Sequence, residues 1–323
     1  MQEILRSNDV VYMSWITALL ADSGIEAVML DTHMSVLEGS VSAIPRRMMV
    51  INEQYDQAMT LVQAAERERE SGTMPDFLLN GRVVLNQPKT GFRAAIDPVI
   101  MAAAVPEKPT GKVLDVGCGV GTAALCYAHR IAGNPSGNPV VGLEKQPEMA
   151  ALALENVAAN GLEDRIKIIE GDLLDPLEDL EPGSFQHIMA NPPYVAAAQA
   201  DPSMDPARLE SHVEGAAKLA DWIGFAHSRL VHKGSLTLVY DATRLDDVLA
   251  ALKTGFGGVT VFPLWPAAVP EIKGKDAKRI IVQARKDVRT PARFCSGLVL
   301  HNSDGTYTEA AEKILRDCEA LAF

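Results

Sequence analysis

The sequence predicts an α/β protein with a mostly parallel sheet, preceded by a smaller α+β module. From about residue 77 onward, short apolar runs typical of strands alternate with helical segments, which is the pattern of a parallel sheet. The predicted strand centres are Val113, Val140, Ile166, Ile188 and Leu236. A content of 47% hydrophobic and 22% charged residues in 323 positions fits a globular chain with one large core and one smaller core.

The amino-terminal module is predicted over residues 1–70. Its elements are expected in the order strand 3–6, helix 9–23, strand 26–31, strand 47–51 and helix 53–65. Asn52 can cap the second helix, because a short polar side chain accepts a bond from a free helical amide. Residues 66–72 contain no apolar side chain, so we expect a frayed helix end and a linker there, with the second domain spanning 76–323.

The second domain is predicted from its strand and helix signals. A strand over 112–116 is followed by a helix over 122–131, and a later strand covers 185–190. Two β-rich runs near the end, 259–264 and 279–284, have no long helix between them. We therefore expect these two runs to form an antiparallel pair at the sheet edge.

The composition excludes several classes of protein. No apolar stretch reaches about eighteen residues, and the first ten residues lack a secretory pattern, so we expect a cytoplasmic protein that does not enter a membrane. The four cysteines have no C-x-x-C spacing, which favours reduced thiols and predicts no metal site. A net charge of -12 excludes a protein that is basic throughout, so any nucleic-acid contact requires a local basic patch.

A glycine-rich turn follows the first strand of the second domain. Gly117, Gly119 and Gly121 remove side chains where the backbone passes close to a ligand, and glycine tolerates positive φ angles. Asp115 opens the turn, at the strand-to-helix crevice where open α/β sheets bind nucleotides. The G-x-G-x-x-G spacing of dinucleotide sites is absent because Thr122 occupies the place of the third glycine, which disfavours a nicotinamide cofactor.

Acidic residues close the next two predicted strands. Glu144 stands where a carboxylate can accept both hydroxyls of a ribose. Asp172 could accept a hydrogen of an adenine amino group, beside the backbone of Leu173. A glycine turn with two carboxylates suits S-adenosylmethionine, which carries an adenosine, a sulfonium and an amino-acid end. A helix-capping role for Glu144 and a merely structural turn are the alternatives.

The tetrapeptide Asn191-Pro192-Pro193-Tyr194 follows the predicted strand 185–190 and suits a nitrogen acceptor. An exocyclic amine is a poor nucleophile because its lone pair is delocalised into the ring. The Asn191 side-chain oxygen, which would also border the cofactor, and the Pro192 carbonyl could each accept an amino hydrogen and direct the lone pair toward the sulfonium. Pro193 stiffens the backbone and lines the substrate side with Tyr194, whose ring offers a stacking face.

The two strand ends together predict an N-methyltransferase. A rigid turn without a catalytic role is the alternative for the tetrapeptide, since Asn and Pro both favour turns. A cysteine nucleophile is not indicated, because neither Cys118 nor Cys126 lies near the acceptor strand end. Catalysis would therefore rest on positioning and in-line geometry, and the displaced proton would leave to water.

A basic strip, defined as residues 273–293, is the candidate RNA surface. Eight lysines and arginines against two aspartates give the strip a net charge of +6, whereas the rest of the chain carries -18. Lys278 and Arg279 are the members that we expect to contact substrate phosphates. The alternative is an edge strand protected by cationic side chains. Residues 196–208 could form a loop over the acceptor.

These motifs resemble those of a known family, the class I methyltransferases that form N6-methyladenosine beside the anticodon of a valine tRNA. The resemblance is carried by residues 114–121 (LDVGCGVG), 191–194 (NPPY) and 91–99 (GFRAAIDPV). It covers about residues 76–320 and implies a Rossmann-like, seven-stranded class I methyltransferase sheet, S-adenosylmethionine as the cofactor and tRNA as the RNA substrate. It also implies that Phe92 and Arg93 line the methionine end of the cofactor or the acceptor mouth, and that Asp97 and Pro98 are the N-cap and a first-turn residue of a helix.

Alternatives remain at the level of substrate and class. The tetrapeptide also occurs in relatives that methylate protein glutamine or N2 of guanine in ribosomal RNA, although the segment 91–99 favours the tRNA branch. Residues 1–66 resemble a small bacterial module described as signal-transducing. We expect a ferredoxin-like α+β fold there, with a regulatory role or a protein partner. A protein that senses S-adenosylmethionine and signals without catalysis is the alternative of another class.

Overall fold

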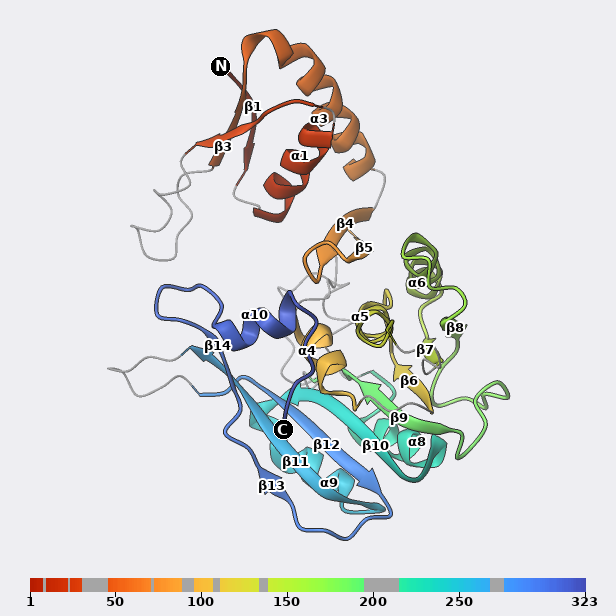
Figure 1. Cartoon of the computed structure of the whole chain (residues 1–323). Coiled ribbons are helices and arrows are strands. Elements are labelled where there is room, and N and C mark those ends of the chain that lie inside the picture. The colour runs from red at the N-terminus through yellow and green to blue at the C-terminus, as the bar shows by residue number, and fades with distance from the viewer. Residues whose placement is uncertain are drawn as a thin grey trace. The chain divides into compact units, whose positions relative to one another are not determined.

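A computed structural model of the chain divides into two units, Met1–Asp76 and Phe77–Phe323 (Figure 1). The residues described are 1–7, 10–22, 24–30, 46–70, 73–88, 96–106, 111–133, 139–194, 215–267 and 276–323. Within these ranges no helix is long and apolar enough to cross a membrane. The segments 91–93 and 196–208, which contain Phe92, Arg93 and the expected acceptor loop, lie outside the described residues.

The amino-terminal unit is a three-stranded antiparallel sheet with two helices. Its elements are β1 (Gln2–Ser7), α1 (Val10–Asp22), β2 (Val28–Leu30), β3 (Arg46–Val50), the one-turn helix η1 (Asn52–Gln54) and α3 (Tyr55–Glu70). The strand order β1-β3-β2 is that of the first three strands of a ferredoxin-like fold, which agrees with the predicted α+β module. Because α3 continues to Glu70, the polar run after residue 65 is helical rather than frayed.

Helical spacing explains how this small unit forms a core. Tyr12, Met13, Ile16 and Leu20 recur on one side of α1, and all four are buried. They pack in one cluster with apolar side chains of β3 and α3, such as Met48. A sheet of this size needs helices on one face to bury enough apolar surface for stability.

The second unit alternates strands and helices along the chain. Its first half contains β4 (Thr73–Leu78), which begins just before the unit boundary, β5 (Val83–Pro88), α4 (Ile96–Ala104), β6 (Lys112–Val116), α5 (Thr122–Arg130), β7 (Val140–Glu144), α6 (Pro147–Ala159), β8 (Ile166–Glu170) and β9 (Phe185–Ala190). The second half contains α8 (Leu219–Arg229), β10 (Leu230–Asp241), η3 (Ala242–Arg244), α9 (Leu245–Leu252), β11 (Phe256–Ala267), β12 (Arg279–Lys286), β13 (Arg293–Phe294), β14 (Leu298–His301) and α10 (Glu309–Leu315).

The large sheet has the order β13-β11-β12-β10-β9-β6-β7-β8, and β14 pairs with β11. The five strands from β10 to β8 are parallel to one another. Seven strands, β6 to β12, form the predicted class I sheet, and the short strands β13 and β14 extend it beyond seven. The antiparallel pairing of β11 with β12 is confirmed. The pair lies at one end of the sheet, as predicted, with only the short strands β13 and β14 beyond β11 among the described residues.

Helices lie on both faces of this sheet (Figure 1), and a hydrophobic core fills the space on each face. Neighbouring residues of β6 point to opposite faces, so Val113 belongs to one core and Leu114 to the other. One core contains apolar side chains of α4, α5, α6 and α10, and the other contains those of α8 and α9. Helices on both faces explain why the central strands are nearly continuous apolar runs.

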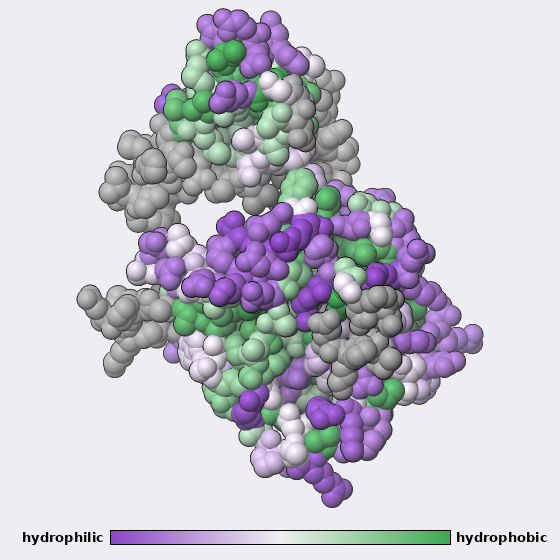
Figure 2. Space-filling model, in the orientation of Figure 1, coloured by the Kyte–Doolittle hydropathy of each residue, from purple (hydrophilic) through white to green (hydrophobic). Residues whose placement is uncertain are grey.

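The helix α10 shows how the outer surface stays polar. Ala311 and Ile314 are buried, whereas Glu309, Lys313 and Arg316 are exposed. Lys313 pairs with Glu309 at 2.8 Å, and Arg316 pairs with Glu312. Figure 2 shows the result as a hydrophilic area over this helix.

The strand β5 is attached to α6 by two asparagine side chains. Asn160 accepts from the Val84 amide at 2.9 Å and donates to the Val84 carbonyl at 2.7 Å. Asn156 makes the same pair of bonds with the backbone of Asn86, at 2.7 and 3.0 Å. The two side-chain amides thus make the backbone hydrogen bonds that a second neighbouring strand would make. They hold β5 against the end of α6.

Candidate active site

The carboxyl ends of β6 and β9 lie side by side at the centre of the sheet. In the parallel pairing of these strands Val116 stands opposite Ala190. The glycine turn begins at the next residue of one strand, and Asn191 is the next residue of the other. The strand order also changes direction at β6: β7 and β8 follow on one side of β6, and β9 and β10 follow on the other side. Open α/β sheets bind ligands at such a switch point.

The glycine turn needs glycine for two different reasons. Gly117, Gly119 and Gly121 have φ angles of 68°, 55° and 86°, a region that residues with side chains rarely adopt. A Cβ at Gly117 would lie 2.6 Å from the Trp222 ring, so the close approach also excludes a side chain. A Cβ at Gly119 would meet no atom within 4 Å among the described residues. The turn is therefore closed at Gly117 and open at Gly119.

Asp115 lies buried beneath this turn, with 2% of its surface exposed. Its Oδ2 has no hydrogen-bond partner in the described part of the chain. Burial raises the pKa of Asp115 to about 8; the amide of Ala124 opposes this shift and the charge of Glu144 adds to it. The carboxyl group is therefore largely protonated at neutral pH in this structure, and a cation beside it would favour ionisation.

Glu144 connects the end of β7 to the glycine turn. Its Oε2 accepts from the Gly119 amide at 2.8 Å, and its Oε1 accepts from the Gln146 amide at 2.9 Å. The side chain is buried, and each oxygen keeps a further lone pair for a ligand. Glu144 thus places its carboxylate at the end of β7, where the sequence predicts it. The hydrogen bond to the Gly119 amide is an additional contact that the sequence does not predict.

Asp172 and Leu173 follow β8, the neighbour of β7. The Oδ2 of Asp172 lies 2.8 Å from Lys145 Nζ, and its Oδ1 accepts from the Leu174 amide at 3.0 Å. Burial works to raise the pKa of Asp172, but the hydrogen bonds with Lys145 and Leu174 and the Lys145 charge together lower it. An ionised carboxylate thus stands at the third strand end, and Leu173 packs against the core beside it.

The acceptor tetrapeptide also contains a buried polar atom without a partner among the described residues. The Oδ1 of Asn191 is buried and has no hydrogen-bond partner among the residues that the structure describes. Pro192 is buried, whereas Pro193 and Tyr194 are half-buried. A buried amide oxygen without a partner costs about 1–3 kcal/mol, so its presence at a strand end is typical of a site that a ligand completes.

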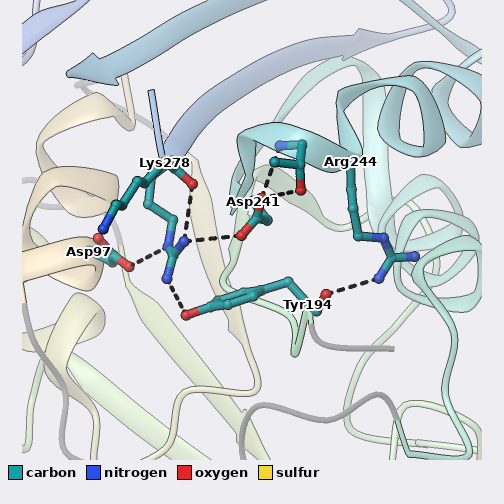
Figure 3. A network of polar contacts seen from close by, with 7 residues as sticks. Asp97, Tyr194, Asp241, Arg244 and Lys278 are labelled. Carbon is teal, nitrogen blue, oxygen red and sulfur yellow. Dashed lines mark hydrogen bonds and ion pairs between the residues drawn. The ribbon is translucent and has the colours of Figure 1, made fainter. Parts of the chain in front are cut away.

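Tyr194 is held by contacts with several segments (Figure 3). Its carbonyl accepts from Arg244 Nη1 at 3.1 Å, and its hydroxyl accepts from Arg279 Nη2. The Arg279 guanidinium carbon lies 4.2 Å from the centre of its ring. Burial raises the pKa of the Tyr194 hydroxyl, although the charge of Arg279 opposes the shift, so the hydroxyl stays protonated.

The described part of the basic strip, residues 276–293, is divided between two ends of the sheet. Arg279 stands opposite Asp241 at the carboxyl end of β10, whereas Arg285 stands opposite Ser235, six positions earlier in β10. Since a strand rises about 3.3 Å per residue, the two arginines are about 20 Å apart. Arg285 donates to the Lys233 carbonyl at 3.1 Å, away from the site. Lys278 and Arg279 therefore lie at the carboxyl strand ends, whereas Arg285 lies far from them, and Lys273 and Lys275 lie outside the described residues.

The sequence prediction also missed several residues that the fold brings to the site. Trp222 comes from α8 and lies over Gly117, and Arg244 comes from η3. Neither residue stands in a local motif, so no sequence signal pointed to it. Asp97 and Pro98 both lie in the first turn of α4, so the N-cap position expected for Asp97 is wrong, and the Asp97 carboxylate instead accepts from Arg279 Nε at 3.1 Å. Lys278 is exposed next to Arg279.

Comparisons with known proteins now decide the family. Residues 96–263, more than half of the chain, match the methyltransferase small domain family. The chain belongs to this family. It is an S-adenosylmethionine-dependent methyltransferase. Residues 1–66 of the methyltransferase match a second family, described as "Putative prokaryotic signal transducing protein".

Curated relatives and a solved structure are similar to this methyltransferase. The tRNA1(Val) (adenine(37)-N6)-methyltransferase of Aeromonas salmonicida is 27% identical over 222 residues, which cover 68% of this chain and 87% of the relative. The enzyme of the same name from Haemophilus influenzae is 26% identical over 239 residues, covering 72% and 94%. A protein of Agrobacterium tumefaciens described as a predicted O-methyltransferase shares the fold, with a TM-score of 0.56 at 24% identity and coverage of 70% of this chain and 98% of that one.

The site of the methyltransferase fits S-adenosylmethionine. The open side of Gly119 leaves room against the backbone. Asp115 and Asn191 supply buried oxygens without partners in the described residues, and both can face a cationic sulfonium ligand. Glu144 and Asp172 supply carboxylates at the two neighbouring strand ends, as a ligand with hydroxyl and amino groups requires.

Gly119→Ala is expected to weaken S-adenosylmethionine binding roughly tenfold or more, about 1.4 kcal/mol, because the methyl group would project into the open side of the turn. The positive φ adds about 1–2 kcal/mol of strain. Gly161→Ala is the matched control: Gly161 has a φ of 63° and open surroundings, but it ends α6 at the opposite edge of the sheet. Thermal stability should fall similarly in both variants, and titration calorimetry should find lower affinity only in Gly119→Ala. Equal affinities would exclude the open side of Gly119 from the cofactor site.

Asp115→Asn is expected to change how stability depends on pH. The folded protein keeps a proton on Asp115 up to about pH 8, whereas the unfolded chain releases it near the ordinary pKa of 3.8. The free energy of unfolding of the wild type should therefore fall as pH rises between about 4 and 8, with a contribution on the order of 1 kcal/mol per pH unit. Urea unfolding of cofactor-free protein at several pH values should find a flatter dependence in Asp115→Asn. The same slope in both proteins would mean that folded Asp115 is already ionised.

Proposed function

We propose that this methyltransferase transfers a methyl group to an exocyclic amine, N6 of an adenine in RNA, within a tRNA anticodon loop. The observation that carries the proposal is Asn191. Its Oδ1 is buried and has no hydrogen-bond partner in the described ranges. Asn191 directly follows β9, the strand that pairs with β6 ahead of the glycine turn. The relatives that bear the name tRNA1(Val) (adenine(37)-N6)-methyltransferase support the choice of substrate.

The proposed cofactor residues lie around the glycine turn. Each oxygen of Glu144 accepts one backbone amide and keeps a free lone pair. These lone pairs would accept hydrogen bonds from the ribose hydroxyls. Asp172 and Leu173 would meet the adenine, and Asp115 would lie near the positive charge of the ligand. When bound, S-adenosylmethionine supplies an electrophilic methyl group, and its sulfur takes back the bonding electrons.

The proposed acceptor chemistry rests on hydrogen-bond acceptance and geometry. The Asn191 Oδ1 would accept one hydrogen of the amino group, and the Pro192 carbonyl would accept the other. Both bonds favour a pyramidal nitrogen whose lone pair forms the new N–C bond. Because Asn191 has no basic group, the displaced proton would leave to water. The rate would therefore depend on positioning, which holds the reacting atoms in line.

An unpaired adenine suits the surface around Tyr194. Base stacking on a tyrosine ring contributes about 1–3 kcal/mol in single-strand binders, and the half-buried ring has part of its surface accessible. An anticodon-loop base is already unpaired, so moving it into a site costs little. Exposed Lys278, next to the site, would contact a phosphate. A tRNA substrate would place the reaction in the cytoplasm.

Asn191→Ala is expected to lower turnover at saturating substrate by about 10² to 10³, the usual cost of removing one preorganised group that stabilises a transition state. Binding of S-adenosylmethionine should fall far less than turnover, because the Asn191 oxygen borders the cofactor but makes its hydrogen bond with the acceptor amine. Single-turnover methyl transfer and titration calorimetry measure the two quantities separately. Wild-type turnover in Asn191→Ala would exclude the acceptor role of this side chain.

The substrate is tested by offering labelled S-adenosylmethionine with total tRNA, total ribosomal RNA and cell protein in parallel. Nucleoside analysis of the labelled fraction should find N6-methyladenosine in tRNA. Label in protein glutamine or in N2-methylguanine of ribosomal RNA would assign the enzyme to one of those substrates. Cofactor binding without transfer to any fraction would favour a sensor, or a requirement for a protein partner bound through residues 1–66.

A further inference from the structure

The guanidinium group of Arg279, at the start of β12, contacts α4, the end of β10 and Tyr194, and Figure 3 labels these partners as Asp97, Asp241 and Tyr194. Its Nε donates to Asp97 of α4 at 3.1 Å, and its Nη1 lies 3.3 Å from Asp241 at the end of β10. The same Nη1 donates to the Lys278 carbonyl at 3.0 Å, and Nη2 donates to the Tyr194 hydroxyl. All three nitrogens of the guanidinium group are therefore engaged within the protein.

The guanidinium group also covers one face of the Tyr194 ring. Its carbon lies 4.2 Å from the ring centre, well within the 6 Å or so of a cation–π contact. Tyr240 meets the same ring at 81° with centres 6.3 Å apart, and Arg244 holds the Tyr194 carbonyl at 3.1 Å. The plane of the ring is thus fixed by contacts at its face, its hydroxyl and its backbone.

The charges around Arg279 argue against a phosphate contact. Asp97 and Asp241 flank its single positive charge with two carboxylates. Only 24% of the Arg279 side chain is exposed, and the two carboxylate side chains are exposed to a similar extent. A phosphate approaching this guanidinium group would meet two negative charges and would have to displace existing bonds.

We propose that Arg279 is a positioning residue for the acceptor: it fixes the plane of Tyr194 on which the substrate base stacks, and it does not contact RNA phosphates. The inference rests on the proposed function, since it assumes a base as the acceptor. It changes the role that the sequence predicted for Arg279 and gives Asp97 and Asp241 the role of holding the guanidinium group. This role requires the planar guanidinium group, whose several N–H donors contact Asp97, Asp241 and Tyr194 together. The single ammonium group of a lysine cannot make the same set of contacts.

The test compares Arg279→Lys, which keeps the charge, with Arg279→Gln, which removes it, in the full-length protein. A positioning role predicts that both variants lose about 10²-fold in turnover with tRNA, as expected for a misplaced reacting group. Affinity for S-adenosylmethionine and the salt dependence of tRNA binding should match the wild type. A phosphate contact predicts the opposite: Arg279→Lys would keep most activity, and Arg279→Gln would reduce the salt slope by about 1. That second result overturns the proposal.

Two controls separate positioning from general damage to the fold. Arg316→Lys makes the same exchange at an exposed residue directly after α10, where the partner Glu312 lies on that helix, and should leave turnover unchanged. In a Tyr194→Ala background, Arg279→Lys should cost no more than about twofold, because the ring that it positions is gone. Full additivity of the two substitutions would overturn the positioning role.

Hydrogen exchange supplies a readout that needs no substrate. Peptides containing Tyr194 should exchange faster in Arg279→Lys than in the wild type or in Arg316→Lys, because the ring and its backbone lose a contact. Unchanged exchange would overturn the proposal even if turnover fell. A wild type that methylates no RNA would instead refute the proposed function, whereas RNA methylation that survives intact in Arg279→Lys would refute the positioning role alone.

Discussion

The parallel pairing of β6 with β9 is the constraint on which the site depends. It aligns Val116 with Ala190, so two motifs that are far apart in sequence leave the sheet next to each other. The sheet grows outward from β6 in both directions, and the crevice forms where these directions diverge. A slip of one residue in this register would turn every side chain of the strand to the opposite face of the sheet, and the two apolar cores oppose such a slip.

The rigidity of this arrangement allows polar groups to remain buried without complete hydrogen bonding. Asp115 and Asn191 each have a buried oxygen without a partner among the described residues, in a site that apolar strands and helices surround. Each such atom costs about 1–3 kcal/mol, a cost that the packed cores offset. Natural proteins concentrate local strain and unsatisfied groups at functional sites, where a ligand can complete them.

The acceptor side is organised by a strand that runs against the others. Because β12 is antiparallel to β10, its first residue rather than its last lies at the carboxyl edge of the parallel strands. This brings Arg279 to Tyr194 and leaves Arg285 at the far end of the strand. The same reversal separates Lys278 and Arg279 from Arg285, which lies at the opposite end of β12.

Local patterns in the sequence determined the strands at Lys112–Val116 and Phe185–Ala190, the glycine turn, the acids at the next strand ends and the small amino-terminal α+β unit. These signals are local because strand alternation, helical spacing and the φ preference of glycine depend on neighbouring residues. The tertiary structure alone decided the interior position of β12, the place of Trp222 over Gly117, and the partners of Arg279, which lie 182 residues away at Asp97 and 38 residues away at Asp241. Contacts between residues so far apart depend on the order of the strands in the sheet and on how the helices pack. Local sequence patterns do not specify that order.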